Sequence, residues 1–63
     1  MKQRVLRGIA KAIVQNEKTI ANKESTVEEI RAAMDAIKEL TNQVTSLEDL
    51  FALDEIISDM MRE

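Results

Sequence analysis

The sequence predicts an all-α protein, either a small three-helix bundle or a helical hairpin, completed by oligomerisation. Three observations favour this fold class. The chain has no proline and one glycine, and Ala, Glu, Lys, Leu, Ile and Met dominate it, a composition typical of helices. Apolar residues recur at steps of three and four from Leu6 to Phe51, which is the period of a helix with one buried side. Leu, Ile, Val and Phe supply 17 of the 63 residues, more than disordered chains contain.

The length of 63 residues predicts a single domain, spanning 1–63,. The chain has no cysteine and no histidine, so disulfides are excluded and a structural zinc site lacks its usual ligands. A chain this short buries only about 60% of its unfolded surface. Small domains without such cross-links use a partner subunit or unusually good helix packing. We therefore expect self-association or a complex with another protein.

Three helices are expected, at about 2–22, 26–41 and 46–62. The stretch "NKESTVEEI" contains two pairs with the spacing of a capping box, Ser25 with Glu28 and Thr26 with Glu29,. The second break is expected in "LTNQVTSLED", where weak helix formers precede a third such pair, Thr45 with Glu48,. The unbroken apolar phase also fits one long coiled-coil helix, although the uncharged flanking positions favour a wider bundle face. A single kinked helix over 26–62 would give the hairpin.

The apolar faces of the expected helices differ in width. Helix 26–41 keeps its apolar residues within about 140°, which predicts one core-facing side; they are Val27, Ile30, Ala33, Met34, Ile37 and Leu40. Helix 46–62 spreads its apolar residues over roughly 220°; they are Leu47, Leu50, Phe51, Leu53, Ile56, Ile57, Met60 and Met61. An arc this wide is typical of a buried helix.

Two interpretations of helix 46–62 follow. It is either the buried centre of a three-helix domain, or a helix that packs on its own chain on one side and on another protein on the other. The second interpretation assigns the partner contact to Leu50, Leu53, Ile57, Met60 and Met61. Methionine side chains adapt to varied surfaces. Phe51 is interpreted as a core residue.

Helix 2–22 is expected to have its core face at Val5, Leu6, Ile9, Ile13 and Ile20. Asn16 lies within this apolar arc, and it is either a polar residue where the face meets water or a contact that fixes the register of a dimer. Gly8 and Ala12 form a small notch that a second helix could approach, although such a pair is usually incidental.

The charges are segregated along the chain. Residues 1–23 carry six Lys/Arg against one Glu, whereas residues 24–63 carry three against eleven Asp/Glu. Four cations of the first half fall within about 60° of one helix side, opposite the core; they are Arg4, Arg7, Lys11 and Lys18. This basic face is a solvated surface, a docking site for an acidic partner or second copy, a phosphate-binding surface, or a membrane-surface helix that lacks the usual aromatic anchors.

Catalytic chemistry is not indicated by the sequence. His, Cys, Tyr and a glycine-rich loop are all missing, and the paired carboxylates are sequence neighbours that point in different directions on a helix,. We expect no enzyme activity, no cofactor, no metal and no small-molecule substrate. The uncharged apolar runs are too short to span a membrane, and a cytoplasmic location is the default expectation.

The function expected from these patterns is that of a small helical protein-interaction module. It would act as a regulator or inhibitor by binding a partner protein, with a homodimer as the expected assembly. The alternative is a nucleic-acid-associated helical dimer that uses the basic face of helix 2–22. An assembly unit of a larger particle is a third interpretation.

Overall fold

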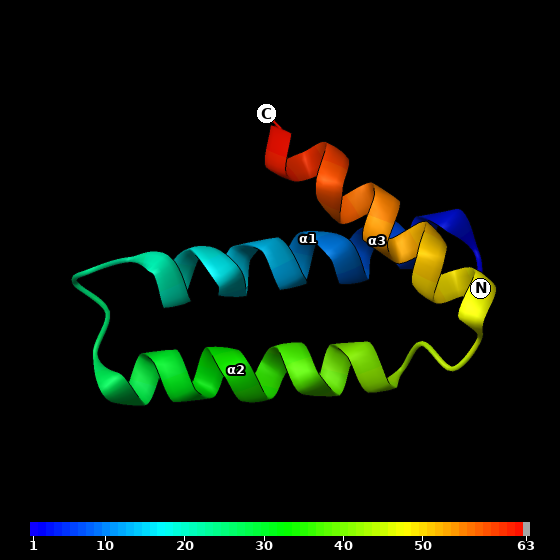
Figure 1. The fold of residues 1–63 in the computed structure, drawn as a ribbon. Helices are drawn as coiled ribbons and strands as arrows, with labels where there is room; N and C mark the ends of the chain where they lie inside the picture. Colours follow the sequence, from blue (N-terminus) through cyan, green and yellow to red (C-terminus); the bar gives the residue numbers. More distant parts are fainter. Residues whose placement is uncertain (63) are drawn as a thin grey trace.

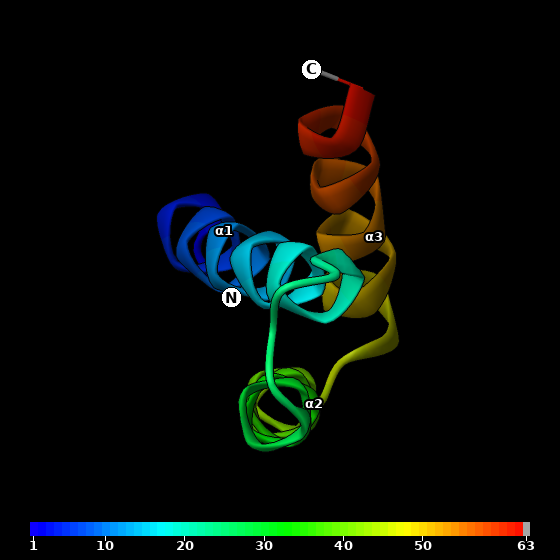
Figure 2. The same ribbon diagram turned by 90° about the vertical axis from the view of Figure 1, so that its left-hand side faces the viewer.

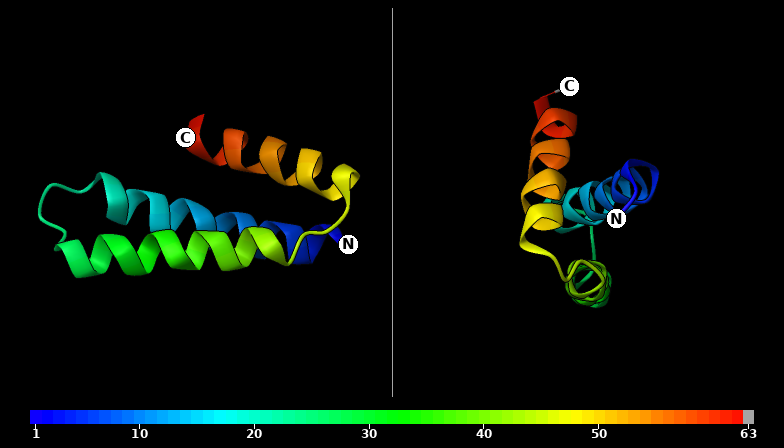
Figure 3. Two further views of the ribbon diagram at one scale, coloured as in Figure 1. Left: turned by 60° about the horizontal axis from the view of Figure 1, so that its bottom comes forward. Right: turned by 90° about the vertical axis from the view of Figure 1, so that its right-hand side faces the viewer.

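The computed structural model describes residues 1–62, which form three α-helices and no strand (Figure 1). The helices are α1 (Gln3–Ala21), α2 (Val27–Asn42) and α3 (Leu47–Arg62). This confirms the all-α class and the three-helix division, with boundaries within one residue of those expected, and it rules out the single rod and the kinked-helix hairpin. Helices α1 and α2 run antiparallel side by side, and α3 crosses α1 obliquely (Figures 1 and 3).

The turn between α1 and α2 is built by Asn22. Its backbone is extended (φ −76°, ψ 122°), which ends α1. Its side-chain oxygen accepts a hydrogen bond from the Glu24 backbone amide at 3.0 Å, and its carbonyl accepts one from the Ser25 amide at 3.1 Å. Asn favours such turns because its side chain can imitate a backbone acceptor. The chain can therefore reverse direction here without a glycine.

Helix α2 begins with a capping box at Thr26. The Glu29 amide donates to Thr26 Oγ1 at 3.1 Å, and the Thr26 amide donates to Glu29 Oε1 at 3.4 Å. Of the two pairs that the sequence offered, the structure uses Thr26 with Glu29, and Ser25 lies before the helix. The acidic residues of this first turn, Glu28 and Glu29, also stabilise the helix because their negative charges lie at the positive end of its dipole,.

The second turn brings the chain back to the core. The Val44 amide donates to the Thr41 carbonyl at 3.1 Å, and the Val44 side chain is buried. Helix α3 begins at Leu47, so the residue that precedes it is Ser46. The expected pair of Thr45 and Glu48 would start the helix one residue earlier, at Ser46,. The Leu50 amide donates to the Ser46 carbonyl at 3.0 Å, which closes the first turn.

Helix α1 is the central element of the fold. It supplies five of the eight buried hydrophobic residues, and the full set is Leu6, Ile9, Ala10, Ile13, Val14, Ala33, Val44 and Leu53. Within residues 1–62, α1 packs against both other helices, whereas no Cα atom of α2 lies within 8 Å of a Cα atom of α3 (Figure 2). The interpretation that placed helix 46–62 at the buried centre is therefore wrong for this chain. The start of α3 is also tied to the start of the chain, because the Met1 ammonium lies 3.2 Å from Asp49 Oδ2.

Candidate interaction faces

The five partner-contact residues expected on α3 occupy different depths in the structure. Leu53 is 4% exposed and belongs to the core cluster. Leu50, Ile57 and Met60 are half-buried and pack against that cluster, while Met61 is 56% exposed. The expected set therefore mixes residues that hold α3 onto α1 with one residue, Met61, that is presented to the outside.

Other large apolar side chains are more exposed than the expected set. On α3 they are Leu47 (67% exposed) and Phe51 (66%), and on α2 they are Val27 (75%) and Met34 (58%). The apolar pattern predicted core positions for Phe51, Val27 and Met34. The physical reason for the difference is that α2 and α3 each pack against a single helix, α1, which covers only part of each apolar arc,. The pattern also predicted a core position for Val5 of α1, which is 48% exposed because it lies at the edge of the apolar arc of that helix,.

Val27 and Met34 lie on the flank of α2 that faces the same side as α3. They lie about 100–120° round the helix axis from the buried Ala33, measured in the sense in which the helix turns from each residue to the next,. On α1, the flank in that direction carries Arg7 and Val14, which line hollows against α3. Antiparallel helices turn in opposite senses when viewed along one axis, so these two flanks lie on the same side. Figure 2 looks along α2 and shows α1 above it and α3 on the right-hand side.

Phe51 faces outward on that same side. It is two residues from the buried Leu53, which is about 200° round the helix, so it points away from α1,. Leu47 and Met61 lie about 80° and 120° round α3 from Glu55, on the side away from the hollow that Glu55 borders,. Met61 also borders a second hollow, which it shares with Val14 and Lys18 of α1.

We call the exposed apolar residues of α2 and α3 the open face; it consists of Val27, Met34, Leu47, Phe51 and Met61. Met1 and Val5, at the start of the chain, are also about half exposed and are not part of it.

The open arrangement leaves more surface exposed than a typical monomer has. A folded protein of 7.2 kDa is expected to expose about 4100 Å², whereas this chain exposes 5113 Å². The radius of gyration of its Cα atoms is 12.0 Å, compared with about 10.6 Å expected for this length. The excess of roughly 1000 Å² is close to the 800 Å² that each partner buries in a standard interface.

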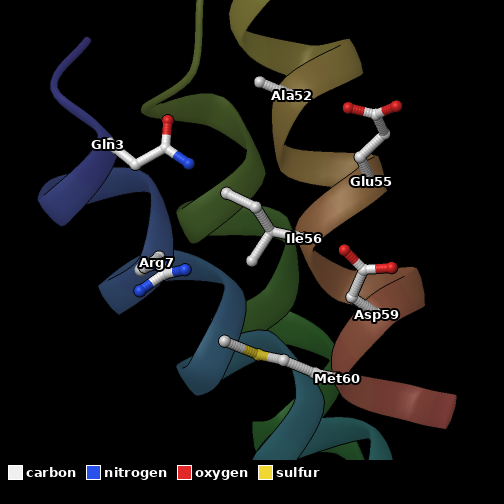
Figure 4. Close-up of a pocket in the computed structure, with 7 residues that line it drawn as sticks. All are labelled: Gln3, Arg7, Ala52, Glu55, Ile56, Asp59 and Met60. Atoms are coloured by element: carbon white, nitrogen blue, oxygen red, sulfur yellow. The ribbon is translucent and has the colours of Figure 1, made fainter.

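A hollow of about 460 Å³ lies between α1 and α3 on the opposite side of α3 from Leu50 and Ile57. Figure 4 shows Ile56 and Met60 extending from α3 toward α1, with Glu55 and Asp59 on its outer edge. Arg7 closes the α1 side, but no ion pair joins it to these carboxylates among residues 1–62. The lining of this hollow therefore combines one guanidinium, two carboxylates and several apolar side chains.

The basic face of α1 is present as the sequence predicts it. Arg4, Arg7, Lys11 and Lys18 are all exposed. In the part of the chain that the structure describes, none of the four forms an ion pair. Their charges are therefore available to a ligand, and helix α3 lies next to this face, where Arg7 and Lys18 line hollows with it.

Two polar or small positions of α1 are explained by the helix itself. The Asn16 side-chain amide donates to the Ala12 carbonyl at 2.8 Å, and Asn16 is half-buried. A Cβ atom placed on Gly8 would meet nothing within 4 Å. Among residues 1–62, packing therefore leaves room for a larger side chain at Gly8.

Comparison with known proteins found no matching family, no matching curated protein and no matching solved structure. Within the described residues there is no cluster of three or more side chains suited to hold a metal ion. None of the three described helices has the length and apolar character needed to cross a bilayer.

Proposed function

We propose that this chain is a non-enzymatic helical protein-interaction module. It acts in the cytosol as a regulator or inhibitor by occupying the surface of a partner protein, and its expected assembly is a homodimer. The observation that carries the proposal is the open face. Its five large apolar side chains are each more than half exposed, because α2 and α3 pack on α1 and not on each other.

The chemistry of the open face supports a protein partner. Burying apolar surface stabilises a complex by about 25 cal/mol for each Å² removed from water. Aromatic residues and methionine are enriched at the centres of interfaces. Phe51 supplies a large rigid side chain, while Met34 and Met61 adapt to different shapes,. Leu53, Leu50 and Ile57 hold α3 in position beneath it.

The experiment is site-specific photo-crosslinking in the native host. A photoreactive residue at position 51 should capture a defined polypeptide, which mass spectrometry then identifies, and adding Met34→Ser should reduce the yield. The matched control places the same photoreactive residue at position 39, because Glu39 is also exposed but lies on the other flank of α2,. Equal capture at positions 39 and 51, or no capture at position 51, would contradict the proposal.

A second candidate function is nucleic-acid association through the basic face, which the exposure of its four unpaired cations favours. A monomer that contacts four phosphates of duplex DNA gives a slope of about −3.6 for log affinity against log salt concentration, and a dimer can double it. Filter binding at low salt should show retention that Arg4→Ala with Arg7→Ala removes. Absence of retention by the unmodified chain would exclude this candidate.

A further inference from the structure

A carboxylate lies between two residues of the open face on α3. Leu47, Asp54 and Met61 follow one another at seven-residue steps, which keeps them within about 40° of one line along α3,. Asp54 is exposed, and no cation pairs with it within residues 1–62. A partner that covers this face would take the carboxylate out of water, which is costly unless the partner supplies a cation. The occupant of the open face should therefore carry a positive group beside its apolar contact.

Helix α2 of this chain carries such groups. Lys38 and Arg31 lie about 40° and 60° beyond Met34 on the outer edge of the open face, and both are exposed,. They are seven residues apart, so they are separated by about 10.5 Å along the helix. Neither forms an ion pair among the residues that the structure describes. The α2 half of the open face thus presents apolar groups with a cationic edge.

The two halves of the open face are complementary to each other. Helix α3 carries five Asp/Glu against one Arg, so α3 packed on α3 would repel,. Helix α2 carries four Asp/Glu against two cations, but both cations lie within about 60° of Val27 and Met34, whereas its carboxylates lie about 80° or more from them,. The α2 edge matches α3 because it places Arg31 and Lys38 where Asp54 needs a counter-ion. Both halves lie on one side of one chain, which is what a two-fold self-complementary contact requires. The excess surface of roughly 1000 Å² is also enough for a standard interface.

We propose that a second copy of this chain occupies the open face, with α2 of each copy packed on α3 of the other. Met34 and Val27 of one copy cover Phe51 and Leu47 of its partner, and Arg31 and Lys38 pair with Asp54. Each contact forms twice, because a two-fold interface uses the same surface on both copies. This inference rests on the proposed function: it assigns the open face to the homodimer contact, so the polypeptide captured at position 51 is a second copy of this chain.

The experiment is a charge exchange followed by sedimentation of single and mixed variants. Asp54→Lys places three cations together in its own homodimer, and the double variant Arg31→Glu with Lys38→Glu places three carboxylates together. Each alone should weaken dimerisation by at least about tenfold, since like charges in an interface cost several kcal/mol. In a mixture, Asp54→Lys should pair with the double variant, because every charged contact in that heterodimer joins opposite signs.

Glu39→Lys is the matched control. It makes the same charge change as Asp54→Lys at an exposed position outside the open face, and it should dimerise as the unmodified chain does. Circular dichroism confirms that every variant remains helical. The proposal is overturned if the unmodified chain is monomeric up to millimolar concentration, if Asp54→Lys dimerises like the control, or if the mixture forms no heterodimer. Capture of a different protein at position 51 by a monomeric chain would overturn the second copy and leave the proposed function standing.

Discussion

Thr26 and Glu29 each accept a hydrogen bond from the backbone amide of the other at the start of α2, at 3.1 Å and 3.4 Å. The Thr26 hydroxyl also donates to Glu29 Oε1 at 3.2 Å. These bonds satisfy two amides that a helix leaves without internal partners. In the described chain α2 packs only on α1. The position at which α2 begins is therefore set mainly by the hydrogen bonds between Thr26 and Glu29.

Thr26→Ala should lower the free energy of unfolding by about 1 kcal/mol, because it removes the acceptor of the capping box. Ser25→Ala is the matched control, since Ser25 precedes the helix and offers its backbone amide, not its side chain, to Asn22. Urea unfolding followed by circular dichroism measures both. An equal loss in the two variants would show that the box does not stabilise α2.

Gly8→Ala should stabilise the fold by about 0.5–1 kcal/mol. Gly8 lies in the interior of α1 at an exposed position, and an added Cβ meets no atom within 4 Å. Glycine in a helix interior costs about that amount relative to alanine. For a domain of this size the gain corresponds to a rise in Tm of several degrees, about 4–8 °C per kcal/mol, measured by thermal unfolding. A fall in Tm would mean that another chain approaches α1 closely at the Gly8 notch.

Leu53→Ala should destabilise the monomer strongly and Phe51→Ala should not, although the two residues are only two positions apart. Leu53 is 4% exposed in the core, and its truncation should cost about 2–5 kcal/mol, which is a large share of the stability of a domain this small,. Phe51 is 66% exposed, so its truncation should change the stability of the monomer by no more than about 0.5 kcal/mol,. Unfolding measured at low protein concentration separates this effect from association.

The two truncations should also separate in sedimentation. Phe51→Ala should weaken self-association while the helix content stays constant, whereas Leu53→Ala should reduce the helix content itself. If Phe51→Ala unfolds the isolated chain, then Phe51 contributes to the core of the monomer and the open face is smaller than the structure indicates.

The sequence predicted the helices well because their signals are local. The capping residues, the weak helix formers near residue 44 and the 3–4 spacing all act within a few turns, and each expected helix boundary lies within one residue of the boundary in the structure. Which part of a wide apolar arc is covered depends on where distant helices pack. That is why Phe51 and Met34, which the sequence predicted to be core residues, are exposed in the structure. Leu53 was assigned to a partner contact and lies in the core for the same reason.

Asn16→Ala should keep the association state unchanged and raise the free energy of unfolding by up to about 0.7 kcal/mol, because asparagine is a weaker helix former than alanine. The Asn16 amide donates to a carbonyl of its own helix, and a half-buried side chain can be removed without stranding a polar partner,. Asn16 also lies on α1, which is covered by α2 and α3 rather than part of the open face. Gln15→Ala at the neighbouring exposed position is the control. Sedimentation equilibrium decides between the two interpretations of Asn16, because an asparagine that fixes the register of a dimer would change the oligomer size when it is removed.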